Sequence, residues 1–162
     1  MANLFLFLSL SLFFSKNIIN NKIPESNAII VEYVHSVIGE KVGRGECWDL
    51  ASEALEKADA EWNGKYTYGE LLSLKTDTIL PGDIIHFTNV KMKYERNDTL
   101  FTEKMKNHTA IVYKVKKINQ IFTIAEQNTS KGRFVTTSKL EIENIIKGKI
   151  KIYRPVKEDE KH

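Results

Sequence analysis

The pattern of apolar and polar residues divides the chain into a helical first half and a second half of strands. Apolar side chains recur at helical spacing between residues 28 and 38, and again from Cys47 to Ala60. The glycine-rich stretch Gly39–Gly45 predicts a loop between these two helices. A further short helix is expected near Gly69–Leu72.

Short apolar runs and alternating segments after residue 80 predict a sheet. The turn Leu80–Asp83 precedes an apolar strand at 84–87, and the polar segment Lys91–Lys106 is expected to be a long hairpin loop. Further strands are expected at 108–115, 121–128, 132–135 and 149–153. Helices followed by strands indicate an α+β fold, with N-terminal helices packed on an antiparallel β-sheet.

Composition and charge exclude several classes of protein. A chain of 162 residues with 42% hydrophobic residues is sized for one globular domain. The single cysteine excludes an internal disulfide and a multi-cysteine zinc site. Two of the three net positive charges come from Lys16 and Lys22, so the basic balance gives no argument for a nucleic-acid partner, and none is expected.

The amino terminus carries an apolar segment at residues 4–14, LFLFLSLSLFF. It has the length of the apolar region of a signal peptide and is shorter than the roughly 20 residues of a membrane-spanning helix. Residues 1–22 are therefore interpreted as a signal peptide or hydrophobic leader, residues 23–156 as the catalytic domain and 157–162 as a charged tail. A buried first helix or an uncleaved surface anchor is the alternative for the leader.

Three glycosylation sequons, at Asn97, Asn107 and Asn128, bear on the compartment. Two of them contain or adjoin candidate site residues, where a glycan would crowd the site. Export from a bacterium therefore fits better than a glycosylating secretory pathway, and a secreted or periplasmic protein is expected.

Cys47 and His108 are the first candidates for chemistry. Cys47 follows a glycine-rich loop and opens a helix, where unpaired backbone N–H groups and the helix dipole favour thiolate over thiol. His108 begins a strand and shares a face with Ala110 and Val112, which points its ring toward the interior. The alternative for each residue is an ordinary place in the core.

Glu126 and Asn128 end the following strand on the face that carries Phe122 and Ile124. Polar groups that continue an apolar face need hydrogen-bonding partners. Either residue could accept a hydrogen bond from Nδ1–H of His108 and leave the other ring nitrogen for the thiol. The alternative is a strand that simply emerges into solvent.

Four motifs in this order resemble the CHAP family (cysteine, histidine-dependent amidohydrolases/peptidases) of the papain-like cell-wall hydrolases. The resemblance is carried by Gly45–Leu50, Pro81–Phe87, Asn107–Val112 and Glu126–Asn128. It implies a papain-like fold with Cys47 as nucleophile, His108 as general base, Glu126 orienting the histidine and Asn128 as a further polar member. It also implies a peptidoglycan amidase or endopeptidase that acts on a peptide or peptidoglycan-like substrate and needs no metal or cofactor.

Glu46 departs from the family pattern, which often has glutamine before the cysteine. A carboxylate there opposes a thiolate unless it points away or pairs with Arg44. This keeps open a catalytically inactive CHAP-like binding domain, and a third reading is a docking module driven by residues 4–14. His86 is interpreted as structural, and a zinc site built from His35, Cys47, His86 and His108 has no ligand spacing in its favour.

Overall fold

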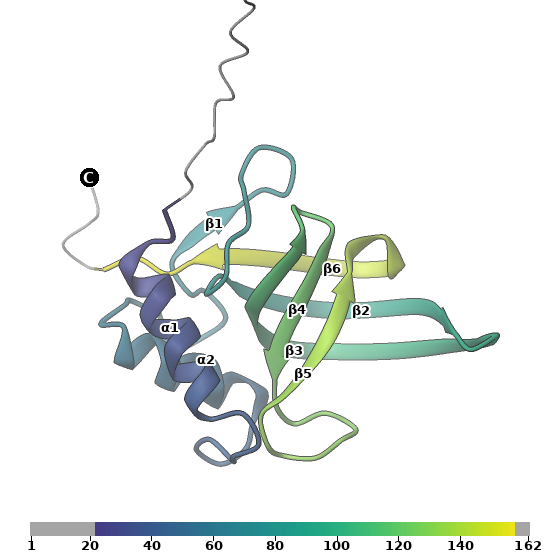
Figure 1. Ribbon diagram of the computed structural model, residues 1–162, viewed down its shortest axis with the longest axis horizontal. Coiled ribbons are helices and arrows are strands. Elements are labelled where there is room, and N and C mark those ends of the chain that lie inside the picture. The colour runs from purple at the N-terminus through teal and green to yellow at the C-terminus, as the bar shows by residue number, and fades with distance from the viewer. Residues whose placement is uncertain (1–21, 158–162) are drawn as a thin grey trace, which may run out of the picture.

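The computed structural model describes residues 22–157 as two helices followed by a six-stranded sheet (Figure 1). The elements in chain order are α1 (Glu25–Ser36), α2 (Cys47–Lys57), β1 (Glu70–Leu72), β2 (Ile84–Arg96), β3 (Thr99–Lys117), β4 (Ile121–Glu126), β5 (Thr136–Glu141), the 3-10 helix η1 (Ile142–Asn144) and β6 (Ile145–Arg154). The sheet order is β1-β6-β2-β3-β4-β5, and every pair in it is antiparallel. The predicted α+β arrangement is confirmed.

The two helices pack on one face of the sheet, because each presents an apolar stripe to it. Leu50, Ala51, Ala54 and Leu55 of α2 join Ile30 and Val34 of α1 in a buried cluster with sheet residues Ile84, Ile111 and Ala125. This packing places the first turn of α2 beside the middle of β3 and the end of β4. Residues 37–46 connect the two helices.

A second buried cluster lies on the other face of the sheet. Its members come from five strands and the loop before β2, and include Phe87 of β2, Val112 of β3 and Phe122 of β4. Strand alternation puts His108 on this face, since its cross-strand partner Phe87 and its neighbour Ala110 both belong to it. The predicted inward direction of His108 follows from this register.

Residues 91–106 are not a loop but two paired strands that form a long hairpin arm. β2 and β3 stay in register as far as Arg96 and Thr99, and the turn is made by Asn97 and Asp98, both with positive φ. The arm extends well beyond the helices (Figure 1). Its polar composition hid the strands, because most of the arm is solvent-exposed and shows no apolar alternation.

Two other element predictions are wrong. The segment near Gly69–Leu72 is not helical; its last three residues form β1, which pairs with β6, so pairing at the sheet edge overrides the helix propensity of glutamate and leucine. Residues 132–135 belong to a loop, and the strand begins at Thr136, paired with Glu126. The expected leader lies outside the described residues except for Lys22.

The turn before β2 connects α1 to the sheet through Asp83, whose side chain is fully buried. Its carboxylate accepts hydrogen bonds from Asn27 of α1 at 2.8 Å and from Nε and NH2 of Arg154 in β6 at 3.1 and 2.8 Å. Gly82 has a φ of 88°, and a Cβ there would lie 2.5 Å from the Asn27 carbonyl oxygen. The Pro-Gly-Asp motif thus fixes α1 against the sheet.

Candidate active site

The loop before α2 sets the position of Cys47, the first residue of the helix. The carboxylate of Asp49 accepts hydrogen bonds from the backbone N–H groups of Arg44 at 2.8 Å and Glu46 at 3.1 Å, which folds the loop back onto the helix. Gly45 has a φ of 85°, and a Cβ there would meet the Arg133 side chain at 2.9 Å. Cys47 is a free cysteine, and the residue is half-buried.

His108 lies between Cys47 and Glu126. Its Nε2 is 2.8 Å from Oε2 of Glu126, and its ring also hydrogen-bonds the thiol of Cys47. The expectation that a carboxylate would hold Nδ1 is therefore wrong; Glu126 holds Nε2, and Nδ1 is the nitrogen left for the sulfur. The other oxygen of Glu126 accepts a hydrogen bond of 2.5 Å from Ser138 of β5, which fixes the carboxylate.

The electrostatics favour a protonated imidazole. Burial lowers the pKa of His108, but hydrogen bonds with Cys47 and Glu126 outweigh it and raise that pKa to about 9. Burial also opposes ionisation of Glu126, yet the hydrogen bonds from His108 and Ser138 hold the pKa of this carboxyl below its usual range. A positive ring beside a sulfur is the arrangement that stabilises a thiolate.

Gln127 holds the loop that carries Cys47, a role that the sequence did not reveal. Its side chain is fully buried. Its Oε1 accepts a hydrogen bond from the N–H of Val42 at 3.2 Å, and its Nε2 donates to the carbonyls of Val42 at 3.1 Å and Glu46 at 2.7 Å. The residue after Glu126 therefore ties the end of β4 to the start of α2, so the two halves of the site move together.

Asn128 does not reach His108. β4 ends at Glu126, and Asn128 turns out of the strand with a φ of 60° into an exposed position. Its side-chain amide donates to Oε2 of Glu46 at 2.9 Å, while Arg133 binds Oε1 of the same carboxylate at 2.8 Å. The negative charge of Glu46 is thus paired with Arg133, whereas Arg44, the partner considered from the sequence, pairs with Asp49.

An aromatic row continues from the nucleophile. Trp48 lies beside Trp62, with ring centroids 5.9 Å apart, and Trp62 stacks on Tyr68 at 6.0 Å. The guanidinium of Arg44 sits 5.0 Å above the Trp48 ring while also pairing with Asp49. Half-buried Trp48 and Trp62 give the surface next to Cys47 flat apolar faces for a ligand chain.

The comparisons with known proteins assign the chain to a family. The AIM3/BBC1 cysteine proteinase-fold domain matches residues 26–161. The chain belongs to this family. Altered inheritance of mitochondria protein 3 of the yeast Debaryomyces hansenii is 29% identical over 166 residues, which cover 85% of this chain and 18% of that protein. A solved structure described as the crystal structure of Ly7917 aligns with 18% identity and a TM-score of 0.46, over 80% of this chain and 62% of the other.

Membership in the AIM3/BBC1 family supports the papain-like cysteine-proteinase fold and corrects finer expectations. The CHAP family itself is not the one matched. The expected function of a peptidoglycan amidase or endopeptidase is wrong, because the matched relative is a yeast protein and the matched family is AIM3/BBC1. The same finding overturns the expected secreted or periplasmic location in a bacterium.

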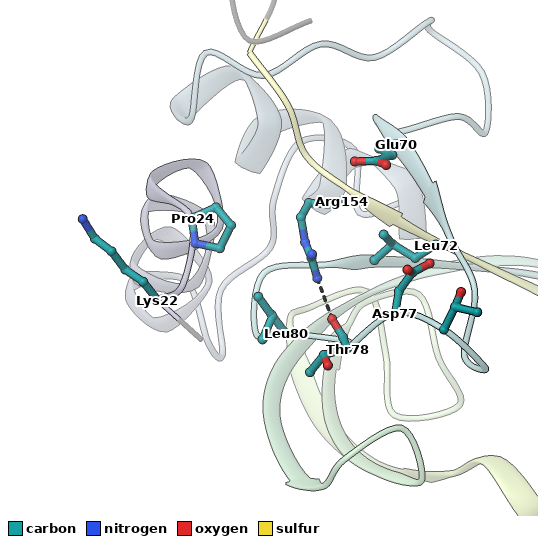
Figure 2. A pocket seen from close by; sticks show the side chains of 9 residues that line it. Lys22, Pro24, Glu70, Leu72, Asp77, Thr78, Leu80 and Arg154 are labelled. Carbon is teal, nitrogen blue, oxygen red and sulfur yellow. Dashed lines mark hydrogen bonds between the residues drawn. The ribbon is translucent and has the colours of Figure 1, made fainter. Parts of the chain in front are cut away.

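Further properties of this AIM3/BBC1-type domain concern metal sites, membrane-spanning helices and cavities. In residues 22–157 no three His, Cys, Asp or Glu side chains are placed to hold a metal, and none of the helices there is long and apolar enough to cross a membrane. A solvent-open hollow of about 460 Å³ lies between the start of α1, β1 and the loop before β2 (Figure 2). Arg154, which lines it, already donates to the Thr78 carbonyl at 2.8 Å and to Asp83. The hollow shares no residue with the Cys47 site.

Proposed function

We propose that Cys47, His108 and Glu126 form a cysteine-peptidase centre that acts on an amide bond of a polypeptide. The observation that carries this proposal is the position of His108, hydrogen-bonded on one side to the thiol and on the other to a carboxylate. A nucleophile, a base and a group that orients the base are the parts that thiol-dependent acyl transfer requires.

The reaction starts with the proton of Cys47 on Nδ1 of His108. The thiolate attacks the amide carbonyl carbon, and the oxyanion that forms lies at the start of α2, where the backbone N–H of Cys47 has no acceptor within the helix. His108 then gives its proton to the leaving amine, and a thioester with Cys47 remains. His108 takes a proton from water, whose oxygen displaces the sulfur and releases a carboxylic acid. Glu126 keeps the ring oriented throughout.

A non-catalytic binding domain is the second candidate. It is supported by the carboxylate of Glu46 directly before the nucleophile, held there by Arg133 and Asn128. It also fits a chain that spans 18% of the length of its yeast relative, whose name specifies no enzymatic activity. In such a domain the site would hold a peptide without attacking it.

Trapping of the acyl-enzyme separates the two candidates. The full chain is mixed with a library of fluorogenic peptide amides, and thioester formation is followed by intact mass spectrometry. The peptidase predicts a mass increase at Cys47 and release of amine, both lost in Cys47→Ala and His108→Gln. Peptide binding that is unchanged in Cys47→Ala, with neither adduct nor amine release in the wild type, would establish the binding domain.

A further inference from the structure

Six lysines occupy one face of the strands that run from the helices into the hairpin arm. Strand alternation places these lysines on the face opposite the second buried cluster. Ile152 of β6 and Met92 of β2 belong to that cluster, and Met105 of β3 packs against it. The opposite face of the same strands carries Lys147, Lys149 and Lys151 of β6, Lys91 and Lys93 of β2, and Lys104 of β3. All are exposed except the half-buried Lys91. We call these six residues the lysine face.

The pairing of the strands brings three of these lysines into one row. Lys147 is the register partner of Lys91 in β6 and β2, and Lys91 is the partner of Lys104 in β2 and β3. Side chains opposite one another on neighbouring strands lie about 5 Å apart, where like charges repel. None of the ion pairs formed within residues 22–157 involves any of the six. An external anion would relieve this repulsion between the three lysines.

Of the two carboxylates in β2, β3 and β6, only one lies on the lysine face. Glu103, the register partner of Met92, belongs to the other face, and its pKa is raised by burial and by the nearby Glu126. Glu95 at the end of the arm is the one acid of β2, β3 and β6 on the lysine face, and its register partner there is Leu100, 64% exposed. The lysine face thus combines a broad positive charge with one protruding apolar side chain at its distal end.

We propose that the lysine face docks on an anionic membrane surface, with Leu100 entering the headgroup layer. Lysine is a compact point charge suited to a diffuse field of lipid phosphates, whereas nucleic-acid recognition favours arginine and stacked aromatic rings, and the positive charge of this face comes from lysine. An exposed leucine beside such charge gains little from a nucleic acid but is stabilised in a bilayer interface. This docking is independent of the chemistry at Cys47.

Vesicle binding by the full chain tests the proposal. Sedimentation is measured with phosphatidylcholine vesicles and with vesicles containing about 30% phosphatidylserine, at 0.1 and 0.5 M salt. Any binding by the apolar residues 4–14 appears in both lipids, so the difference between lipids reports the charge. The triple variant Lys91→Gln, Lys104→Gln, Lys147→Gln is compared with the equally charged control Lys57→Gln, Lys75→Gln, Lys116→Gln, whose lysines are exposed elsewhere.

The proposal expects tighter binding to anionic than to neutral vesicles, weakened at high salt. Each lysine near an anionic leaflet contributes about fivefold, so the face variant loses about 100-fold and the control keeps its affinity. Leu100→Ser weakens vesicle binding several-fold and leaves binding to a duplex oligonucleotide or to polyglutamate unchanged. Equal binding to both lipids, equal losses in the two triple variants, or tighter binding to the oligonucleotide or polyglutamate than to the vesicles would overturn it.

Discussion

The side-chain amide nitrogen of Gln127 lies 2.7 Å from the carbonyl oxygen of Glu46, the residue that precedes Cys47. This hydrogen bond connects the strand that supplies Glu126 to the helix that supplies the nucleophile. Because Gln127 is buried and satisfies three backbone groups of the 42–46 loop, the geometry of the site depends on a residue that touches neither sulfur nor imidazole.

Replacement of Gln127 by leucine is expected to destabilise the domain. The variant keeps the volume but leaves the buried N–H of Val42 without its Gln127 acceptor and removes one of the two hydrogen bonds at the carbonyls of Val42 and Glu46, at a cost of about 3 kcal/mol. For a domain of this size the melting temperature should fall by roughly 10 °C, measured by circular dichroism. The exposed Gln120 gives the matched control, and Gln120→Leu should melt within about 2 °C of the wild type. A Gln127→Leu protein as stable as this control would contradict the role of Gln127 in holding the 42–46 loop.

Glu126→Gln is expected to lower the rate of any thiol-dependent turnover more than Asn128→Ala. The first change removes the carboxylate that orients and charges His108, a loss of roughly 10²–10⁴ in rate, whereas Asn128 contacts Glu46 alone. NMR titration of the His108 ring gives a second readout, because its pKa of about 9 in the wild type should be lower in Glu126→Gln. The reverse ranking of the two variants would assign the orienting role to Asn128.

Stability should depend on pH through His108. Its folded pKa of about 9 is above the ordinary value of histidine, so its contribution is complete below about pH 6.5 and is lost as the pH rises toward 9. The loss is about 3 kcal/mol. Urea unfolding at pH 6 and pH 9.5 should therefore differ more for the wild type than for His108→Gln. Parallel pH profiles of the two proteins would show that His108 is not charged by its neighbours.

Arg154→Met tests the buried anchor between α1 and the sheet. Without the guanidinium, the carboxylate of Asp83 is left without its charged partner, and burial already raises its pKa. We expect a loss of about 3 kcal/mol in unfolding free energy. The double variant Asp83→Asn, Arg154→Met should recover part of it in the same denaturant titration, because no charge then remains unpaired. A double variant less stable than Arg154→Met would contradict this account.

The elements that a sequence alone predicts are those with an apolar face. The helix at Cys47 and the strand at His108 were predicted because their buried residues recur at 3.6 and 2 positions. The hairpin arm was missed because Lys91–Lys106 is polar on most of both faces, and its strands are fixed by pairing alone. Short β1 was missed for the same reason, as its three residues owe their conformation to β6.

The same limit applies to the site. Cys47, His108 and Glu126 stand at positions that local pattern marks, at a helix start and at strand ends. Ser138 and Arg133 come from the β4–β5 region and reach the site only through tertiary contacts, so no local pattern indicated them. The small net charge of +3 likewise concealed the lysine face, because composition sums over the whole chain while the register of β2, β3 and β6 gathers six lysines on one face.

The pH dependence of Cys47 alkylation by iodoacetamide tests most directly whether the sulfur and His108 form a charged pair. An ordinary cysteine reacts about tenfold more slowly with each unit that the pH falls below 8, because its thiolate becomes scarce. The pair predicts that wild-type Cys47 reacts faster at pH 6 than Cys47 of His108→Gln, because a protonated imidazole beside the sulfur favours the thiolate. A wild-type profile that matches an ordinary thiol and is unchanged in His108→Gln would contradict the account.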